Sequence, residues 1–400
     1  MTNNKDYVYY AWLSHRLGAG SSAFKRLINI FGDAKSIYEC RDLSPYGLTE
    51  KQLSSLADLD LKNEERAINA ALNTGFSIIH YNDEIYPKKL KLLSNPPAIL
   101  YVKGIIPDFD KYFSVGIVGT RHPSAESLKM TQKISSDLSK KGVIVISGLA
   151  FGIDSEAHSA ALKNGGFTVG ISAVKAGQIY PKENEFLYSK MYQNGLVICE
   201  HSPVSQVEKS AFPTRNRIIS ALSDALIMME APEKSGALIT AEKSLSLKKP
   251  VFVPYGDITK NSGGRKLLEK KALPLSSEYD ILNYFSGLSD KHFMEIKDDK
   301  SEKIIDVIPE EKHFILTNEK ASETSRVAEA YSVNDESNVP EELDDVEKKI
   351  YLYLKKNFSA STDQLSRDLA LSSVEATSSA SMMEIYGYIK RMPGDKWSIL

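Results

Sequence analysis

The chain has 400 residues and a formal net charge of −2, so no strong overall attraction to a polyanion follows from charge alone. This length exceeds that of an ordinary domain, and two or three domains are expected. The two cysteines lie far apart, which argues against a disulfide framework or a structural zinc site and favours a cytoplasmic location. No apolar run approaches the roughly 18 residues of a membrane span, so no membrane partner is expected.

Residues 1–105 are expected to form a small, mostly helical module of the SAM-like type. Apolar side chains share one face of 7–16, and the segment Leu17-Gly-Ala-Gly-Ser-Ser leads into a second helix over 23–31. Such a helix–turn–helix could seat a nucleic-acid phosphate, but a plain hairpin closed by glycines is the simpler interpretation. Pro96-Pro97 marks the approach to the next domain.

Residues 106–289 are expected to form an α/β domain, because short apolar runs alternate with helix-length segments. The runs are apolar throughout, as strands covered on both faces must be. This pattern predicts a doubly wound, Rossmann-like parallel sheet. The expected strands are 113–118, 143–147, 167–172, 196–199, 225–229 and 250–253, and the expected helices are 124–140, 155–164, 183–194, 214–222 and 237–247.

The loops that follow the strands carry the candidate binding residues, since ligands of this architecture bind at the carboxyl ends of the strands. Two of these loops are glycine turns that open a helix, which is a favourable site for an anion. Lysines and arginines gather on the same expected rim, and Phe151 or Tyr180 could supply a stacking surface. The candidate DNA-binding residues are Gly119, Thr120, Arg121, Ser147, Gly148, Phe151, Lys175, Lys182, Lys209, Arg215, Asn216, Arg217, Lys234, Ser235 and Gly236.

Little in the sequence supports a nucleotide cofactor or a catalytic site. No GxGxxG follows the first strand and no GxxxxGK[ST] occurs, so no cofactor is expected. Asp154 and His158 stand four residues apart at a helix start and could act as an acid–base or metal pair, although a carboxylate that caps the helix is the simpler interpretation. No nucleophile–base constellation can be argued, and we expect a protein that is not an enzyme.

The C-terminal part of the chain divides into two segments. Residues 290–340 are acidic and polar and read as a flexible linker. Residues 341–400 are expected to form a winged-helix domain, with helices near 343–354, 362–370 and 372–386 and a hairpin over 388–399. The expected recognition helix, 373–385, contains no lysine or arginine, which favours a protein-docking role over duplex DNA binding.

The chain resembles the DNA-processing protein A (DprA/Smf) family of bacteria. The resemblance covers about 160 residues in matching order and spacing, and Phe212-Pro-Thr-Arg-Asn-Arg-Ile-Ile is its most specific part. The other matching segments are Ile117-Val-Gly-Thr-Arg121, Ser147-Gly-Leu-Ala-Phe-Gly-Ile-Asp-Ser-Glu-Ala-His158, Ile179-Tyr-Pro-Lys-Glu-Asn184, Ser235-Gly-Ala-Leu-Ile-Thr240 and Val251-Phe-Val-Pro254.

This resemblance implies a single-stranded DNA-binding protein that forms homodimers, protects incoming DNA and loads the RecA recombinase in natural transformation. The family positions that line its DNA pocket correspond to Arg121, Lys182, Lys209, Arg215 and Arg217.

Two other functions stay open. One is a nucleotide-hydrolysing enzyme similar to the phosphoribohydrolases, whose glycine-rich motif has a partial counterpart in Lys234-Ser-Gly-Ala-Leu-Ile-Thr-Ala-Glu242. The other is a phage-defence or signalling sensor that binds a small nucleotide in the same pocket.

Overall fold

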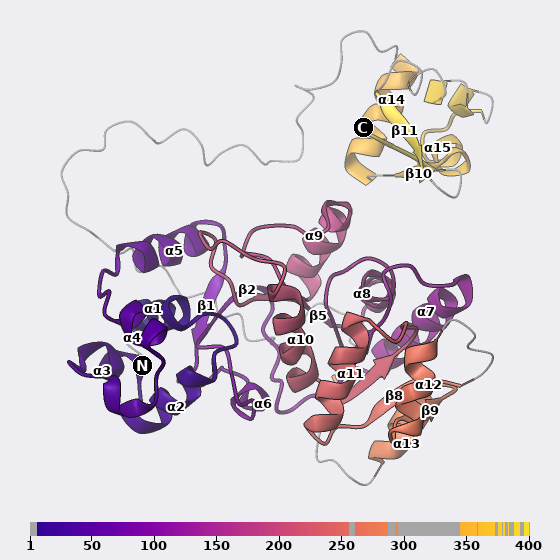
Figure 1. The fold of residues 1–400 in the computed structure, drawn as a ribbon. Coiled ribbons are helices and arrows are strands. Elements are labelled where there is room, and N and C mark those ends of the chain that lie inside the picture. The colour runs from indigo at the N-terminus through magenta and orange to yellow at the C-terminus, as the bar shows by residue number, and fades with distance from the viewer. Residues whose placement is uncertain are drawn as a thin grey trace, which may run out of the picture. The chain divides into compact units, whose positions relative to one another are not determined.

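The computed structural model describes residues 6–255, 261–286, 293–294 and 345–399, the last range with gaps at 358, 373–374, 378, 381–382, 384–387 and 393–395. The chain divides into two compact units, Met1–Glu310 and Glu311–Leu400. Figure 1 shows the helices and strands of both units. Among the described residues, no helix is long and apolar enough to cross a bilayer.

The larger unit begins with a cluster of short helices around a buried aromatic core. Trp12, Leu13, Leu27 and Ile37 are fully buried there. The hairpin between the first two helices needs glycine, because Gly18 and Gly20 adopt φ of 79° and 78°. These helices are α1 (Tyr7–Leu17), α2 (Ser22–Phe31), α3 (Ala34–Glu39), the 3₁₀ turn η1 (Ser44–Tyr46), α4 (Glu50–Leu56) and α5 (Lys62–Asn73).

A nine-stranded sheet follows, in the order β1-β2-β6-β5-β4-β3-β7-β8-β9. β3 to β9 pair in parallel, whereas β2 pairs antiparallel with both β1 and β6. The strands are β1 (Ser77–His80), β2 (Ile99–Gly104), β3 (Ser114–Val118), β4 (Ile144–Ser147), β5 (Thr168–Ser172), β6 (Leu196–Cys199), β7 (Ala225–Met228), β8 (Val251–Pro254) and β9 (Leu273–Leu275).

The sheet confirms the expected doubly wound α/β fold. The expected domain boundary at residue 105 falls directly after β2, and β1 and β2 belong to the same sheet as the strands beyond it. The chain order reverses at β3, which lies between β4 and β7. In this architecture the loops at such a reversal form the crevice where ligands bind.

Helices cover both faces of the sheet (Figure 1). On one face, α10 and α11 pack their apolar side chains against β4, β5 and β7. On the other face, α7, α8 and α13 pack against β3 and the opposite side of β4. The helices are α6 (Lys88–Lys91), α7 (Ala125–Lys140), α8 (Ile153–Lys163), the 3₁₀ turn η2 (Lys182–Asn184), α9 (Glu185–Asn194), α10 (Ala211–Leu222), α11 (Gly236–Ser246), α12 (Ser262–Glu269) and α13 (Glu278–Phe285).

The smaller unit has its own core, which includes Ile350, Leu354, Leu365 and Trp397. Its strands form an antiparallel sheet in the order β10-β12-β11. The expected linker over 290–340 lies almost entirely outside the described residues, as does part of the expected third helix, so the winged-helix assignment stays a prediction. The elements are α14 (Asp345–Asn357), β10 (Ala360–Ser361), α15 (Thr362–Asp368), β11 (Ile389–Met392) and β12 (Lys396–Ile399).

Candidate nucleic-acid interface

Loops at the carboxyl ends of the parallel strands form the candidate interface, which we call the strand-end face. It comprises the loops 119–124, 148–152, 173–181, 200–210 and 229–235 together with the first turns of the helices that follow them. Because β3 lies between β4 and β7, the loops after these three strands are neighbours. The sequence motifs therefore converge on one edge of the sheet.

The loop that carries Arg121 is fixed by its neighbours on both sides. The Thr120 amide donates to the carbonyl of Glu230 (2.7 Å). The amide and hydroxyl of Ser124 donate to the Glu230 carboxylate (2.9 and 2.8 Å). The Ile153 amide, at the start of α8, donates to the Thr120 carbonyl (3.3 Å). The backbone around Arg121 is thus preorganised, while its side chain is exposed.

Two glycines allow the loop after β4 to approach its surroundings closely. A Cβ at Gly148 would lie 2.6 Å from both the Arg215 guanidinium and the Asp154 carboxylate. Gly152 has φ of 75°, and a Cβ there would lie 2.5 Å from the Thr120 carbonyl oxygen. Both positions require glycine for steric reasons, which accounts for the spacing Gly148…Gly152 in the sequence.

Arg215 is not on an exposed rim, contrary to the expectation from the sequence. Its guanidinium is buried and donates to the backbone carbonyls of Gly148 and Ile171 and, through Nε, to the Asn216 side chain (3.0 Å). Asp154 accepts from the Gly148 amide on the other side of the same loop (3.1 Å). Burial lowers the pKa of Arg215, and the Asp154 carboxylate opposes that shift. Arg215 therefore holds the glycine loop in place.

Arg217 is likewise buried and internal, so its expected place on the rim is wrong. It forms a two-point ion pair with the Glu200 carboxylate (2.8 and 2.6 Å). Its Nε donates to the Asn95 carbonyl (2.9 Å). Glu200 lies in the loop after β6, and Asn95 precedes β2. Arg217 therefore links α10 to the strand-end face and to the N-terminal region.

The hydroxyl and amide groups among the candidates also have structural partners. Ser147 is buried and donates to the Ile117 carbonyl (2.5 Å). Contrary to the expectation, its hydroxyl is therefore not available to a ligand. Ser235 caps α11 by accepting from the Leu238 amide (3.2 Å). Asn216 donates to the Gly236 carbonyl (3.2 Å), which ties the second turn of α10 to the first turn of α11.

The remaining cations are available to a ligand. Arg121, Lys182, Lys209 and Lys234 are exposed and Lys175 is partly buried. Within the described part of the chain, none of these five side chains forms an ion pair. No carboxylate therefore holds these side chains at contact distance, so their charged ends can bind phosphates.

Aromatic rings lie beside the exposed arginine. The Arg121 guanidinium sits over the Phe212 ring, with Cζ 5.5 Å from the ring centre. Phe212 in turn packs edge-on against Tyr180, with ring centres 5.3 Å apart. Tyr180 and Phe151 expose 41% and 39% of their surface, so both can stack on a base. The strand-end face thus combines an exposed guanidinium with accessible rings.

Sequence reasoning missed Phe212 and Glu230 as parts of this arrangement. Phe212 is the first residue of the motif Phe212-Pro-Thr-Arg-Asn-Arg-Ile-Ile, but its position at the start of α10 does not reveal that its ring lies under Arg121. Glu230 is the second residue after β7, so the rule that selected the other strand-end residues could have selected it.

Asp154 and His158 do not form an exposed acid–base or metal pair. The N-cap residue of α8 is Gly152, and Asp154, in the first turn, binds the preceding loop instead of capping the helix. The His158 ring is buried against the Thr168 hydroxyl (2.7 Å). Burial, aided by the charge of Arg215, lowers the pKa of His158 to about 3, so this imidazole is neutral. No group of three potential metal ligands occurs among the described residues.

Comparison with known proteins places the chain in a family. The model of the family described as DNA recombination-mediator protein A matches residues 77–286. The chain is 36% identical over 244 residues to DNA processing protein DprA of Bacillus subtilis, covering 58% of this chain and 81% of that protein. It is 29% identical over 412 residues to Protein Smf of Synechocystis, covering 99% of each.

A solved structure shows the same relationship. The X-ray structure of DNA processing protein A from Streptococcus pneumoniae matches with a TM-score of 0.59 at 28% identity, covering 69% of this chain and 97% of that one. Together with the matched family model, this likeness extends over the nine-stranded sheet and the strand-end face. The chain belongs to the DNA recombination-mediator protein A family, known as DprA or Smf.

Proposed function

We propose that this protein binds single-stranded DNA on the strand-end face and acts as a recombination mediator without catalytic turnover. Membership of the recombination-mediator family supports the role. The observation that carries the site is the exposed Arg121 guanidinium, held beside the glycine loops over the Phe212 ring, which in turn packs against Tyr180. This arrangement supplies a phosphate partner and stacking surfaces within reach of each other.

The chemistry of the face suits binding that tolerates any sequence. Lysine and arginine charges contact phosphates, which are the same in every nucleotide. Aromatic rings stack on any base, because every base has a flat face. A duplex keeps its bases stacked inside, so the rings favour an open single strand. We therefore assign Arg121, Lys175, Lys182, Lys209 and Lys234 to phosphate contacts and Phe151 and Tyr180 to stacking.

The alternative of nucleotide hydrolysis gains no support from its proposed glutamate. Glu242 pairs with Lys270 at 3.1 Å, and 47% of its side chain is exposed. An exposed, ion-paired carboxylate is poorly placed for general acid–base work. Release of free base from a nucleoside monophosphate, abolished by Glu242→Gln, would restore the enzymatic hypothesis.

The test is fluorescence anisotropy of a labelled oligonucleotide at two salt concentrations, with duplex competitor. Arg121→Ala should weaken single-strand binding about tenfold and flatten the salt dependence by about 0.7 in slope, because one phosphate contact is lost. Arg41→Ala is the matched control, since Arg41 is also exposed but lies near the N-terminal helices. Equal weakening by both variants, or by neither, contradicts the assignment of the face.

The partners of the mediator are part of the same proposal. We propose that it protects incoming single strands and loads RecA in natural transformation, and that it acts as a homodimer. RecA filament growth on a strand covered by a single-strand-binding protein measures loading, and sedimentation measures the oligomeric state. The protein should accelerate filament growth, and Arg121→Ala should remove most of that acceleration. We assign the winged-helix domain to protein docking, which a truncation at residue 340 tests.

A further inference from the structure

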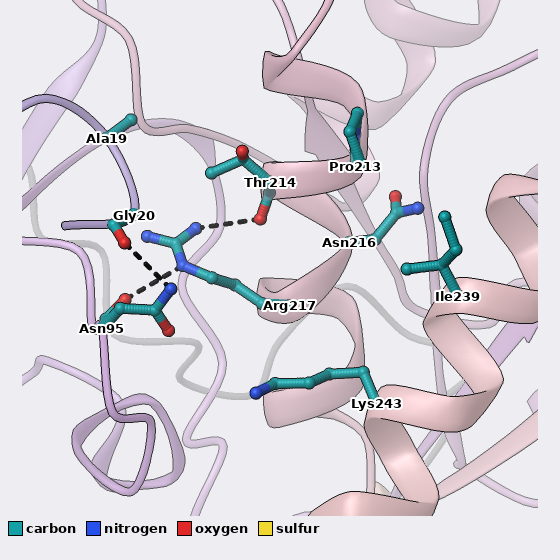
Figure 2. A pocket seen from close by; sticks show the side chains of 9 residues that line it. All are labelled: Ala19, Gly20, Asn95, Pro213, Thr214, Asn216, Arg217, Ile239 and Lys243. Carbon is teal, nitrogen blue, oxygen red and sulfur yellow. Dashed lines mark hydrogen bonds between the residues drawn. The ribbon is translucent and has the colours of Figure 1, made fainter. Parts of the chain in front are cut away.

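A cavity of about 200 Å³ lies between the N-terminal hairpin and the helices α10 and α11 (Figure 2). Segments far apart in the sequence enclose it. The hairpin supplies Gly20, and Asn95 comes from the segment before β2. The helices supply Thr214, Asn216 and Arg217 on one side and Ile239 and Lys243 on the other.

The cavity is a built feature, because hydrogen bonds join its walls. Asn95 donates through Nδ2 to the Gly20 carbonyl (3.0 Å) and accepts at its own carbonyl from Arg217 Nε (2.9 Å), as Figure 2 shows. Gly20 has φ of 78°, and a Cβ there would lie 2.8 Å from the Thr214 methyl group. The hairpin can approach α10 this closely only because residue 20 is glycine.

Two polar groups of the cavity lack protein partners. Within the residues that the structure describes, the Lys243 ammonium forms no ion pair or hydrogen bond, and Figure 2 shows it extending toward Arg217 and Asn95. The charge of Arg217 is compensated by Glu200, so Lys243 supplies the net positive charge. The Asn95 Oδ1 atom is buried and accepts no hydrogen bond. A buried acceptor without a donor costs about 1–3 kcal/mol.

A ligand that binds both groups needs two kinds of polar atoms. The ammonium of the partly buried Lys243 can bind an anion, whereas the buried amide oxygen can accept from an N–H or O–H donor. A nucleotide provides both, through its phosphate and through the N–H groups of its base. Ile239 is 52% exposed and offers an apolar surface to the sugar or the base. A bare inorganic anion would leave the donor requirement of Asn95 unmet.

The cavity also adjoins the strand-end face. Asn216 lines the cavity and, through its bond to the Gly236 carbonyl, helps to form the start of α11 on that face. Lys243 lies seven residues beyond Gly236, about 10 Å along α11, so a strand that passes the start of this helix can extend to it. Pro213 and Thr214, in the first turn of α10, belong to both sites, whereas Arg121 does not line the cavity.

We propose that this cavity is a second subsite for the same DNA strand and takes one nucleotide beyond those on the strand-end face. The phosphate binds Lys243, and a base N–H donates to Asn95 Oδ1. This inference rests on the proposed function, since it extends the path of the strand that the face binds. The hairpin between α1 and α2 is then part of the DNA-binding surface, whereas the rest of the N-terminal helical region lies outside it.

The test compares oligonucleotides of different lengths, from about 4 to about 16 nucleotides. Lys243→Gln removes the charge, and Ile239→Glu places a carboxylate on an exposed wall of the cavity. Lys62→Gln is the matched control, because Lys62 is an exposed lysine outside the cavity. Both cavity variants should bind the shortest oligonucleotides like wild type and the longest about three- to tenfold more weakly. Lys243→Gln should also reduce the salt slope for long strands by about 0.7.

The outcomes separate this inference from the proposed function. If Arg121→Ala weakens binding at every length but both cavity variants match Lys62→Gln, the second subsite is wrong and the face stands. If wild type binds no oligonucleotide at low salt, the proposed function itself fails. If free nucleoside monophosphate raises the melting temperature of wild type but not of Lys243→Gln, while long-strand affinity is unchanged, the cavity serves a free nucleotide and the strand assignment is overturned. Urea unfolding verifies that each variant is folded.

Discussion

Replacing Gly148 with alanine should destabilise the protein and weaken DNA binding together. The added Cβ would lie 2.6 Å from Arg215 Nη2 and from Asp154 Oδ2, whereas ordinary contacts of this kind begin near 3.4 Å. Both neighbours are buried and hydrogen-bonded to the loop, so neither can swing into solvent. Each must move by about 0.8 Å, and such overpacking costs about 1–3 kcal/mol.

Gly236→Ala is the matched control. Its Cβ would meet only Asn216 Nδ2, at 3.8 Å, and Gly236 is exposed at the start of α11. We expect its free energy of unfolding to stay within about 0.5 kcal/mol of wild type. Urea unfolding followed by circular dichroism measures both variants, and anisotropy measures their affinity for single-stranded DNA.

The affinity of the alanine variant at residue 148 should fall several-fold, because the loop also carries Phe151 and contacts Thr120 through Gly152. A Gly148→Ala protein with the urea midpoint of wild type would refute the steric argument. A destabilised variant whose folded fraction binds DNA normally would show that the loop does not position the binding residues.

Three further predictions concern single side chains. Phe212→Leu removes the ring under Arg121 and should weaken DNA binding about two- to fivefold, since an exposed cation–π contact contributes about 0.5–1 kcal/mol; an unchanged anisotropy titration contradicts it. Glu200→Gln leaves the buried Arg217 charge without its carboxylate and should lower the free energy of unfolding by about 3–5 kcal/mol in urea, with partial recovery on adding Arg217→Met. His158 has a pKa of about 3 in the folded protein, against an ordinary value of 6.5, so the unfolded state binds more protons between these values and stability falls as pH decreases. From pH 6.5 to pH 5 this group should remove about 2 kcal/mol, and the same pH change should affect His158→Gln less.

The sequence predicted the parallel core well because buried strands have a simple signature. β6 begins and ends at the expected residues, and β3, β4 and β5 each begin one residue later than expected. In contrast, nothing local in residues 99–104 indicates that this segment pairs antiparallel with residues 196–199. That pairing joins segments almost a hundred residues apart, and a pattern of hydrophobicity does not specify a partner.

Arg215 and Arg217 show that charge alone does not predict whether a side chain is exposed. Arg215 shares a helical stripe with the buried residues Ala211, Ile218 and Leu222, at spacings of three or four. This periodicity placed it on the inner face of α10, but its charge suggested an exposed rim. Arg217 is off that stripe and is buried by Glu200 and Asn95, whose approach no local pattern reveals.

The beginning of α10 performs four tasks because successive residues of a helix point in different directions. Phe212 supports Arg121, Arg215 holds the glycine loop, Asn216 binds the start of α11, and Arg217 joins the N-terminal region. An alanine scan of this segment that measured only DNA affinity would score the buried arginines as phosphate contacts. Their loss should instead reduce the folded fraction, while salt slopes measured on the folded protein stay near wild type. Arg121→Ala should instead flatten the salt slope and leave the folded fraction near wild type. This difference separates a residue that touches DNA from one that shapes the surface for it.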